Sequence, residues 1–287
     1  MTVKPRTASL AVALSALGFG VMVVFAKRVS FRLPGPEVAW LRFLVGALAC
    51  GLATLRRPLA FANKRLLVLR GLMGGSAVLV FFLAVEHLHV GVATLLNYTA
   101  PLWATLWAAV FLREHPKRLT LVAMAVAFAG VVLVLTGREA LRGMDLRWQL
   151  VGVLSGVLSG ASVAVIRELR RTDGSWEIFA AFNLGGLVVC APQALGQWVS
   201  PTPFEWSLLV LVGLLSVGAQ LALTWALRYA TTAGSGVLMQ LTPVAAFVGG
   251  ALAFGDTIPL QSLVGAGIAV VGVGWGAYLG SVPDEDG

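Results

Sequence analysis

The stretch ATLLNYTAP at residues 93–101 recurs in pattern as SGVLMQLTP at residues 235–243. Both stretches are apolar apart from a few hydroxyl and amide side chains, and they end at Pro101 and Pro243. The same shift of 140 to 142 residues also aligns several glycines and both cysteines of the chain. Recurrence at a fixed spacing indicates two copies of one structural unit.

The two units consist of apolar segments, not of a soluble core. Of the 287 residues, 58% are hydrophobic and 12% are charged, about half the ~25% charged fraction of an average soluble domain. Apolar runs of about 20 residues, the length of a membrane-spanning helix, follow one another with short gaps. This pattern excludes a soluble globular protein. It predicts an all-α polytopic membrane protein with two repeats, residues 1–140 and 141–287.

Hydropathy predicts ten transmembrane helices, five in each repeat. Because five is an odd number, the second repeat must enter the membrane from the opposite side, which makes the repeats inverted. Inverted repeats are typical of transporters, since two near-identical halves can exchange conformations and open a central site to each side in turn. The predicted spans are residues 8–26, 37–55, 66–86, 90–112, 119–136, 148–166, 177–196, 205–227, 232–254 and 260–280.

The 21 Lys and Arg residues orient the predicted helices. Cytoplasmic loops are enriched in these residues. Fourteen of them, Arg70 included, fall on the side of the N-terminus and six on the other side, with Arg42 inside a span. We therefore expect both termini in the cytoplasm. The loops also explain the net charge of +8, so a nucleic-acid partner is not expected. The expected partners are the lipid bilayer and a small-molecule substrate, with no obligatory protein partner.

The predicted arrangement resembles a known family of transporters. Two five-helix halves, Arg42 in the second helix, and a fourth helix with Pro101 followed by Glu114 are similar to the EamA-type branch of the drug/metabolite transporter superfamily. The second half repeats this pattern with Pro243 and Asp256. The aromatic residues look most similar to YddG-type exporters, which move aromatic and other neutral amino acids outward. The resemblance implies an exporter in the inner membrane of a bacterium.

Two prolines mark the predicted centre of the membrane. Pro101 and Pro243 lie mid-span, where each removes a backbone donor and clashes with the carbonyl four residues earlier, so a kink is expected at both. Freed carbonyls are tolerated in a membrane beside protein or a water-filled cavity. We therefore expect a substrate site between the kinked helices, with a simple packing kink as the alternative. Its predicted members are Asn97, Tyr98, Trp103, Met239 and Gln240, with Phe19, Phe82 and Gln220 close by.

Arg42 is the one cation that the sequence places several residues into a span. Isolating an ionisable residue there costs at least about 2.5–3.5 kcal/mol, which makes it a functional candidate. It could hold a substrate carboxylate, or it could pair with Glu37 as a gate or structural lock. With a single cation, phosphate-bearing substrates such as nucleotide sugars are not expected, because their charge requires at least two. In the second half, Phe182 aligns with Arg42 and departs from the family pattern.

Other classes of function find little support in the sequence. The two cysteines and three histidines have no spacing suited to metal or redox chemistry, so no metal site or cofactor is expected. An enzyme is not expected either, since no nucleophile and base fall at a common depth. A channel is disfavoured because no span carries a series of like charges or a filter motif. Glycines at four-residue spacing, such as Gly152, Gly156 and Gly160, indicate close packing of helices.

Together these patterns predict a transporter of small neutral or zwitterionic metabolites, amino acids including aromatic ones among them, that works by alternating access. Strong ion coupling is not expected, because the acidic residues lie at the ends of the predicted spans. The alternative is a proton-coupled antiporter of amphiphilic drugs or other metabolites, in which Glu37 or Glu86 would carry the proton.

Overall fold

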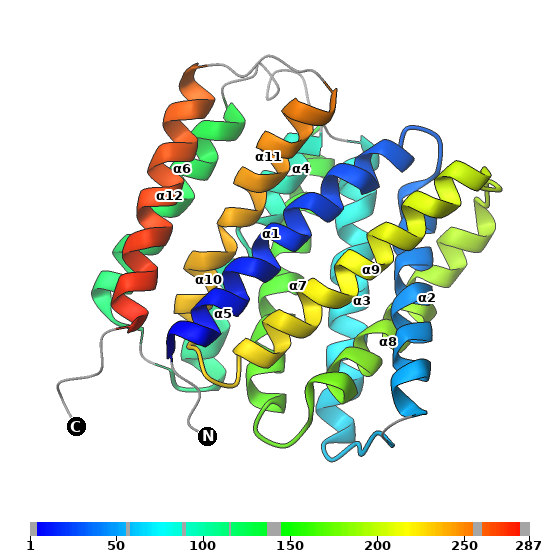
Figure 1. Cartoon of the computed structure of the whole chain (residues 1–287), viewed down its shortest axis with the longest axis horizontal. Helices are drawn as coiled ribbons and strands as arrows, with labels where there is room; N and C mark the ends of the chain where they lie inside the picture. The colour runs from blue at the N-terminus through cyan, green and yellow to red at the C-terminus, as the bar shows by residue number, and fades with distance from the viewer. Residues whose placement is uncertain are drawn as a thin grey trace.

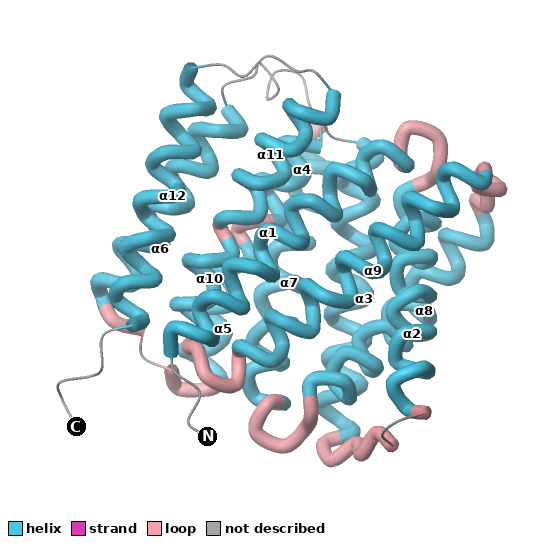
Figure 2. Tube along the Cα trace, viewed as in Figure 1, coloured by secondary structure: helices cyan, strands magenta, loops and turns pink. Residues whose placement is uncertain are grey.

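The computed structural model describes residues 5–55, 58–87, 90–114, 116–136, 145–254 and 260–281. These residues form twelve helices, and no strand occurs among them (Figure 2). The predicted all-helical fold class is therefore confirmed. The helices are α1 (Pro5–Val29), α2 (Gly35–Thr54), α3 (Lys64–His87), α4 (Val90–Asn97), α5 (Ala100–Phe111), α6 (Arg118–Thr136), α7 (Leu146–Leu169), α8 (Ser175–Gly196), α9 (Pro203–Ala226), α10 (Thr232–Met239), α11 (Leu241–Phe254) and α12 (Leu260–Ser281).

Seven helical stretches within the described residues are long and apolar enough to cross a membrane. Three shorter apolar helices accompany them, at Ala100–Phe111, Arg118–Leu133 and Leu263–Gly276. Each of these stretches overlaps one of the predicted spans. The chain is therefore a polytopic helical membrane protein, and ten complete crossings stay a prediction.

Two of the predicted spans are interrupted and not merely kinked. α4 ends at Asn97 and α5 begins at Ala100, so Pro101 lies in the first turn of α5. There the missing N–H of proline needs no partner within the helix. In the second half, α10 ends at Met239 and α11 begins two residues before Pro243. Both prolines thus lie near the start of a new helix, where proline costs less than in a helix interior.

Helices from the two halves of the chain pack against each other. α1 lies along α9 and α11, α7 packs on α3, α4 and α5, and α8 packs on α2 and α3. α6 and α12 pack against each other at one side of the bundle, where both also contact α10 (Figure 1). The centre of the bundle is therefore enclosed by helices from both halves.

Glycines allow the closest of these contacts. A Cβ atom on Gly75 of α3 would lie 2.8 Å from the Cα of Gly186 on α8. On α7, a Cβ on Gly160 would lie 2.6 Å from the Cβ of Trp103, and the other glycines of this stripe face Leu96 and Thr99. Side chains at these positions would separate the helices, which confirms the predicted packing role of the glycine stripe on α7.

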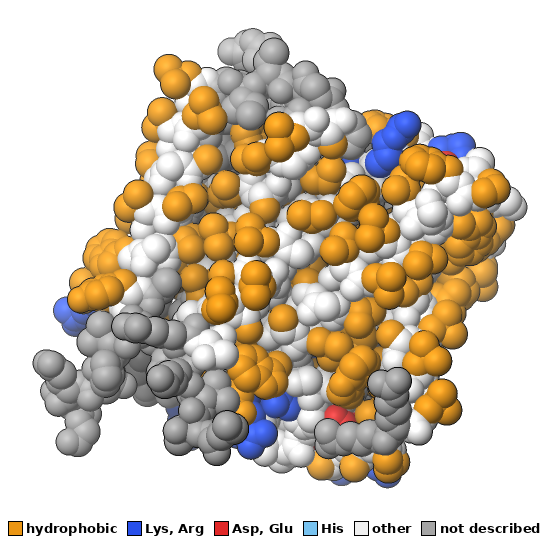
Figure 3. All heavy atoms as spheres, in the orientation of Figure 1, with side chains coloured by type: hydrophobic (Ala, Val, Ile, Leu, Met, Phe, Trp, Pro, Cys, Tyr) orange, Lys and Arg blue, Asp and Glu red, His pale blue; other side chains and the backbone are white. Residues whose placement is uncertain are grey.

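Large apolar side chains cover much of the outside of the bundle. Exposed examples come from many helices, among them Leu52, Phe111, Val188 and Leu252. On the face in Figure 3, hydrophobic side chains spread across the helices, while the Lys and Arg side chains visible there lie near the edges. Such a surface fits contact with lipid tails across the middle and with water or head groups at the ends.

Candidate functional site

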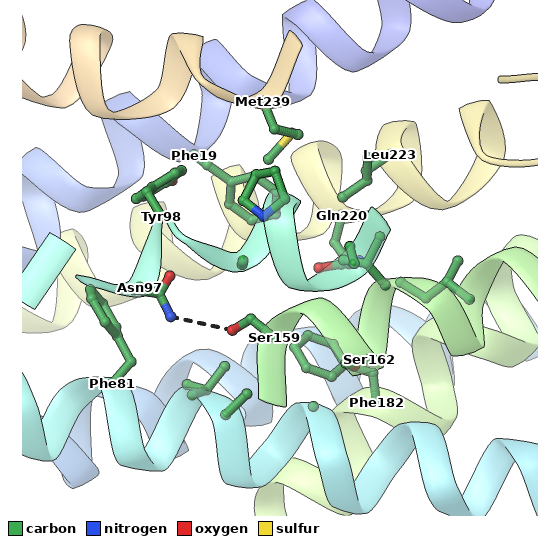
Figure 4. Close-up of a pocket in the computed structure, with 18 of the residues that line it drawn as sticks. Phe19, Phe81, Asn97, Tyr98, Ser159, Ser162, Phe182, Gln220, Leu223 and Met239 are labelled. Atoms are coloured by element: carbon green, nitrogen blue, oxygen red, sulfur yellow. Dashed lines mark hydrogen bonds between the residues drawn. The ribbon is translucent and has the colours of Figure 1, made fainter. Parts of the chain in front are cut away.

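A cavity of about 200 Å³ lies between the two halves of the chain, where α4 is interrupted (Figure 4). Its walls come from α1 to α5 and α7 to α10, and most of its lining is apolar or aromatic. Sites for drug-sized ligands measure about 300–1,000 Å³. The cavity is smaller than that and suits a small metabolite.

Asn97 and Tyr98 stand at the interruption between α4 and α5, and both line the cavity. The side-chain nitrogen of Asn97 donates hydrogen bonds to the hydroxyls of Ser155 at 3.0 Å and Ser159 at 3.2 Å, both on α7 (Figure 4). These bonds hold the end of α4 against α7. The predicted position of both residues beside a cavity agrees with the structure, and their contact with substrate stays a prediction.

The second interruption contributes less of the lining than predicted. Met239 lines the cavity, whereas Gln240 and Pro243 do not belong to the lining. Gln240 is fully buried, and its side-chain nitrogen lies 3.5 Å from the backbone oxygen of Tyr98. Gln240 therefore links the two interruptions to each other, because its side chain points to the broken backbone of α4 and not to the open space.

Phe19 and Gln220 lie in the cavity wall, where the sequence places them. Phe19 comes from α1 and Gln220 from α9 (Figure 4). The side-chain nitrogen of Gln220 lies 3.4 Å from the hydroxyl of Thr224, one turn further along α9. Together they supply one aromatic and one polar group from two neighbouring helices.

Phe82 and Trp103 lie outside the cavity lining, contrary to prediction. Phe82 is buried in the apolar core, and its ring meets the ring of Phe81 edge-on with centroids 5.6 Å apart. Phe81 lines the cavity in its place. The indole nitrogen of Trp103 donates to the hydroxyl of Thr99, 3.2 Å away on the preceding turn. One residue along a helix turns a side chain by about 100°, so an error of one position moves it out of the site.

Arg42 lines the cavity from α2, and its side chain is 7% exposed. One terminal guanidinium nitrogen lies 3.9 Å from the sulfur of Met22. Glu37 is fully buried elsewhere, where its carboxylate accepts a hydrogen bond from the backbone nitrogen of Val199 at 2.9 Å. No ion pair joins Glu37 to Arg42 among the described residues, so the structure favours the cavity role of Arg42 over a lock with Glu37.

Arg70 is a second cation in the same cavity, and the sequence reading missed it. Its side chain is 3% exposed, lines the cavity from α3, and donates to the hydroxyl of Ser162 at 2.5 Å. The charge count assigned Arg70 to a cytoplasmic loop because it stands only a few residues into its span. The signal that could have found it is helical spacing, since Arg70 shares a helix face with Gly74, Ala77 and Phe81.

Phe182 on α8 also lines the cavity and was not among the predicted site residues. The guanidinium carbon of Arg70 lies 4.0 Å from the centroid of its ring, and that of Arg42 lies 5.9 Å away. Arginine over an aromatic face is an attractive arrangement, more so where water is excluded. Phe182 thus contacts the guanidinium group of Arg70, and Arg42 lies near both this ring and that of Phe43, 5.0 Å from the Phe43 centroid.

The described lining contains two arginines and neither aspartate nor glutamate. Within these residues the cavity therefore combines fixed positive charge with aromatic and apolar walls and a few amides and hydroxyls. It can hold an anionic group at one side and an apolar body at the other. The expectation of a single cavity cation was wrong, and the argument against phosphate-bearing substrates that depended on it no longer holds.

A helical bundle with many apolar spans, a central cavity and interrupted helices beside it defines a membrane transporter. Sequence comparison gives the family. The sequence model of the EamA-like transporter family matches residues 6–136 and again residues 146–275. The chain belongs to the EamA-like transporter family.

Several curated proteins are similar over most of the chain. The pseudopaline exporter CntI of Pseudomonas aeruginosa (strain UCBPP-PA14) is 26% identical over 227 residues, which cover 78% of this chain and 79% of the exporter. Solute carrier family 35 member G1 of Homo sapiens is 22% identical over 283 residues, or 93% of this chain and 77% of that protein. An uncharacterized transporter of Archaeoglobus fulgidus is 26% identical over 279 residues, 93% and 95% of the two chains.

A solved crystal structure shares the fold. It superposes with a TM-score of 0.80 and 19% sequence identity, and the match covers 95% of this chain and 96% of the other. At this identity the likeness shows the arrangement of helices alone.

Proposed function

We propose that the protein exports small metabolites that carry a carboxylate on an apolar or aromatic body, amino acids including aromatic ones among them. The observation that carries this proposal is the cavity, whose lining includes the arginines Arg42 and Arg70 together with aromatic residues Phe19, Phe81 and Phe182. Guanidinium binds carboxylate through paired charge-assisted hydrogen bonds, and the aromatic wall accommodates the side chain. The similarity to a protein named as a pseudopaline exporter supports outward transport of a small organic molecule.

Transport proceeds by alternating access between two inverted five-helix repeats. Two matches to one family model, one in each half, support this arrangement. Glu37 of the first half accepts from Val199 in the loop after α8 at 2.9 Å, and the aligned Glu177 accepts from Ala60 in the loop after α2 at 3.4 Å. Such reciprocal contacts are expected of two halves related by a twofold axis.

Both chain termini face the cytoplasm of a bacterium whose inner membrane contains the protein. The start of α1 and the end of α12 lie at the same edge of the bundle, as an even number of crossings requires (Figure 1). The excess of Lys and Arg on that side supports the cytoplasmic assignment.

Substrate moves down its own gradient in this proposal, without strong ion coupling. Proton coupling normally needs a carboxylate or histidine that both sides of the membrane reach in turn. Glu37 is held by Val199 away from the cavity, and the side chain of Glu86, the second candidate, lies outside the described residues. A proton-coupled antiporter of amphiphilic drugs is the competing function, and the two cavity arginines count against it because such drugs are commonly cations.

Purified full-length protein in proteoliposomes tests the proposal. Radiolabelled phenylalanine and 3-phenylpropionate should enter vesicles preloaded with the same compound and not protein-free vesicles. Arg42→Gln should lower this exchange at least about tenfold, since it removes a charge-assisted contact, whereas Arg65→Gln on the exposed face of α3 should leave it unchanged. Absence of exchange for every carboxylate, with exchange of a cationic drug instead, would refute the proposal in favour of the antiporter.

A further inference from the structure

The two cavity arginines share one aromatic ring. Arg42 on α2 and Arg70 on α3 both direct their guanidinium groups to Phe182 on α8, with guanidinium carbons 5.9 Å and 4.0 Å from the ring centroid. Both side chains line the same cavity. The two positive charges therefore lie near the same ring and border the same cavity.

Neither arginine has an acidic partner among the described residues. Arg42 contacts the sulfur of Met22 at 3.9 Å, and Arg70 donates to the hydroxyl of Ser162 at 2.5 Å. The Nε atoms of both arginines are buried and have no hydrogen-bond partner in the described structure. The guanidinium carbon of Arg42 also lies 5.0 Å from the centroid of the Phe43 ring. The printed partners of the two cations are thus neutral: a thioether, a hydroxyl and two aromatic rings.

This arrangement is costly without an anion. Burying a charge away from water requires a counter-charge or several hydrogen bonds, and two like charges beside one another add repulsion. Guanidinium is also always protonated in proteins, so deprotonation does not relieve the cost. Because both Nε donors lack a partner, each guanidinium group can donate more hydrogen bonds than the described residues accept.

We propose that this pair of arginines is a subsite for two negative charges on one small organic anion, so that dianions bind in preference to zwitterions and monoanions. Each guanidinium fork takes one anionic group, and the aromatic wall at Phe19 and Phe81 takes the apolar body. The proposal rests on the function proposed above and narrows its substrate class from carboxylates in general to doubly charged anions.

Compounds with one benzyl body and different charges test this preference by calorimetric titration of the full-length protein in detergent at pH 7.4. The series is 2-phenylethylamine, phenylalanine, 3-phenylpropionate and 2-benzylsuccinate, with benzylphosphonate to distinguish one compact group from two carboxylates. At least one of the two most anionic compounds should bind at least about tenfold more tightly than phenylalanine and 3-phenylpropionate, because it engages a second guanidinium. Equal affinities, or absence of binding by both, would overturn the proposal.

Variants of Arg70 test whether the preference for dianions depends on the arginine pair. Arg70→Gln should abolish the advantage of the dianion, and Arg70→Lys, which keeps the charge but not the fork, should retain part of it. Arg65→Gln, an exposed position on the same helix, serves as the matched control and should bind like the native protein. If Arg70→Gln does not elute as a folded species, the native series and Arg70→Lys still decide the outcome.

The two proposals fail in different ways. Exchange of phenylalanine and 3-phenylpropionate with no preference for dianions would refute the two-charge subsite and leave the proposed export of carboxylates intact. Exchange of a cationic drug with no binding by any compound of the anionic series would refute both.

Discussion

Arg167 joins several helix ends at one end of the bundle. Its Nε donates to a carboxylate oxygen of Glu114 at 2.8 Å, and a terminal nitrogen donates to the backbone oxygen of Leu227 at 2.7 Å. The other carboxylate oxygen of Glu114 accepts from the backbone nitrogen of Thr232 at 3.2 Å. The network ties the segment after α5 to the ends of α7 and α9 and to the start of α10. We predict that Arg167 and Glu114 are energetically coupled.

The size of this coupling follows from the burial of the pair. The two side chains are 27% and 22% exposed, so they lie between a surface ion pair, worth up to about 1 kcal/mol, and a buried hydrogen bond to a charged group, worth about 1.5–3 kcal/mol. We expect a coupling free energy of about 1–2 kcal/mol, so that the double alanine variant loses that much less stability than the two single variants together. Arg167→Ala should cost more than Glu114→Ala, because it removes the donor to two backbone carbonyls, those of Leu227 and Arg228, whereas Glu114→Ala removes the acceptor of one backbone N–H, that of Thr232.

Reversible unfolding of the reconstituted protein, followed by intrinsic fluorescence, measures the coupling in a double-mutant cycle. Arg171 and Glu168 form the control pair, since they are 3.3 Å apart where α7 ends and the following turn begins, and they are 68% and 34% exposed. Their coupling should stay at about 0.2–0.5 kcal/mol. A coupling for Arg167 and Glu114 no larger than that of the control pair would refute the reasoning.

Further predictions concern packing, the site and orientation. Gly75→Ala should destabilise the protein by about 1–3 kcal/mol through overpacking against α8, whereas Gly51→Ala, where a Cβ would meet nothing within 4 Å, should stabilise it by about 0.5–1 kcal/mol; unfolding free energies of the two variants check this contrast. Tyr98→Ala should lower exchange of phenylalanine in proteoliposomes without loss of folded protein, and unaltered exchange would move the site elsewhere. Ala60→Cys should resist an impermeant thiol reagent in intact cells and react after lysis, and labelling of intact cells would reverse the predicted orientation.

Hydropathy predicted the positions of the helices well, because a helix that crosses a bilayer needs a long apolar run regardless of how it packs against its neighbours. The predicted span at residues 148–166 lies inside α7, and that at 66–86 lies inside α3. The two prolines likewise indicated where the backbone departs from a continuous helix: two residues separate α4 from α5, whereas Gln240 alone separates α10 from α11. The composition of the segments thus fixes their positions along the chain.

The face that each helix turns to the cavity was harder to predict. α3 is apolar on all sides, since one side meets lipid and the other meets protein, so hydrophobic periodicity does not define its inner face. The choice of Phe82 over Phe81 is an error of a single residue around α3. The omission of Arg70 has a different cause, its position near the start of the predicted span, which placed it with the cytoplasmic charges. Similarly, Gln240 was assigned to the substrate because a buried amide needs a partner, and its partner proved to be the backbone of Tyr98.

The two cavity arginines are distributed unequally between the two halves of the chain. Both Arg42 and Arg70 belong to the first half, and the aligned positions in the second half carry Phe182 and Val212. The sequence pattern of the helices thus recurs in the second half, but the positive charges at these two positions do not. Under the proposed alternating access, substitution at a few positions of one half would change selectivity, while the other half would keep the framework that the movement needs. Duplication of an ancestral five-helix unit, followed by substitutions at the binding site of one half only, would produce this asymmetry. Substrate specificity could then change while the helices that both halves share are kept.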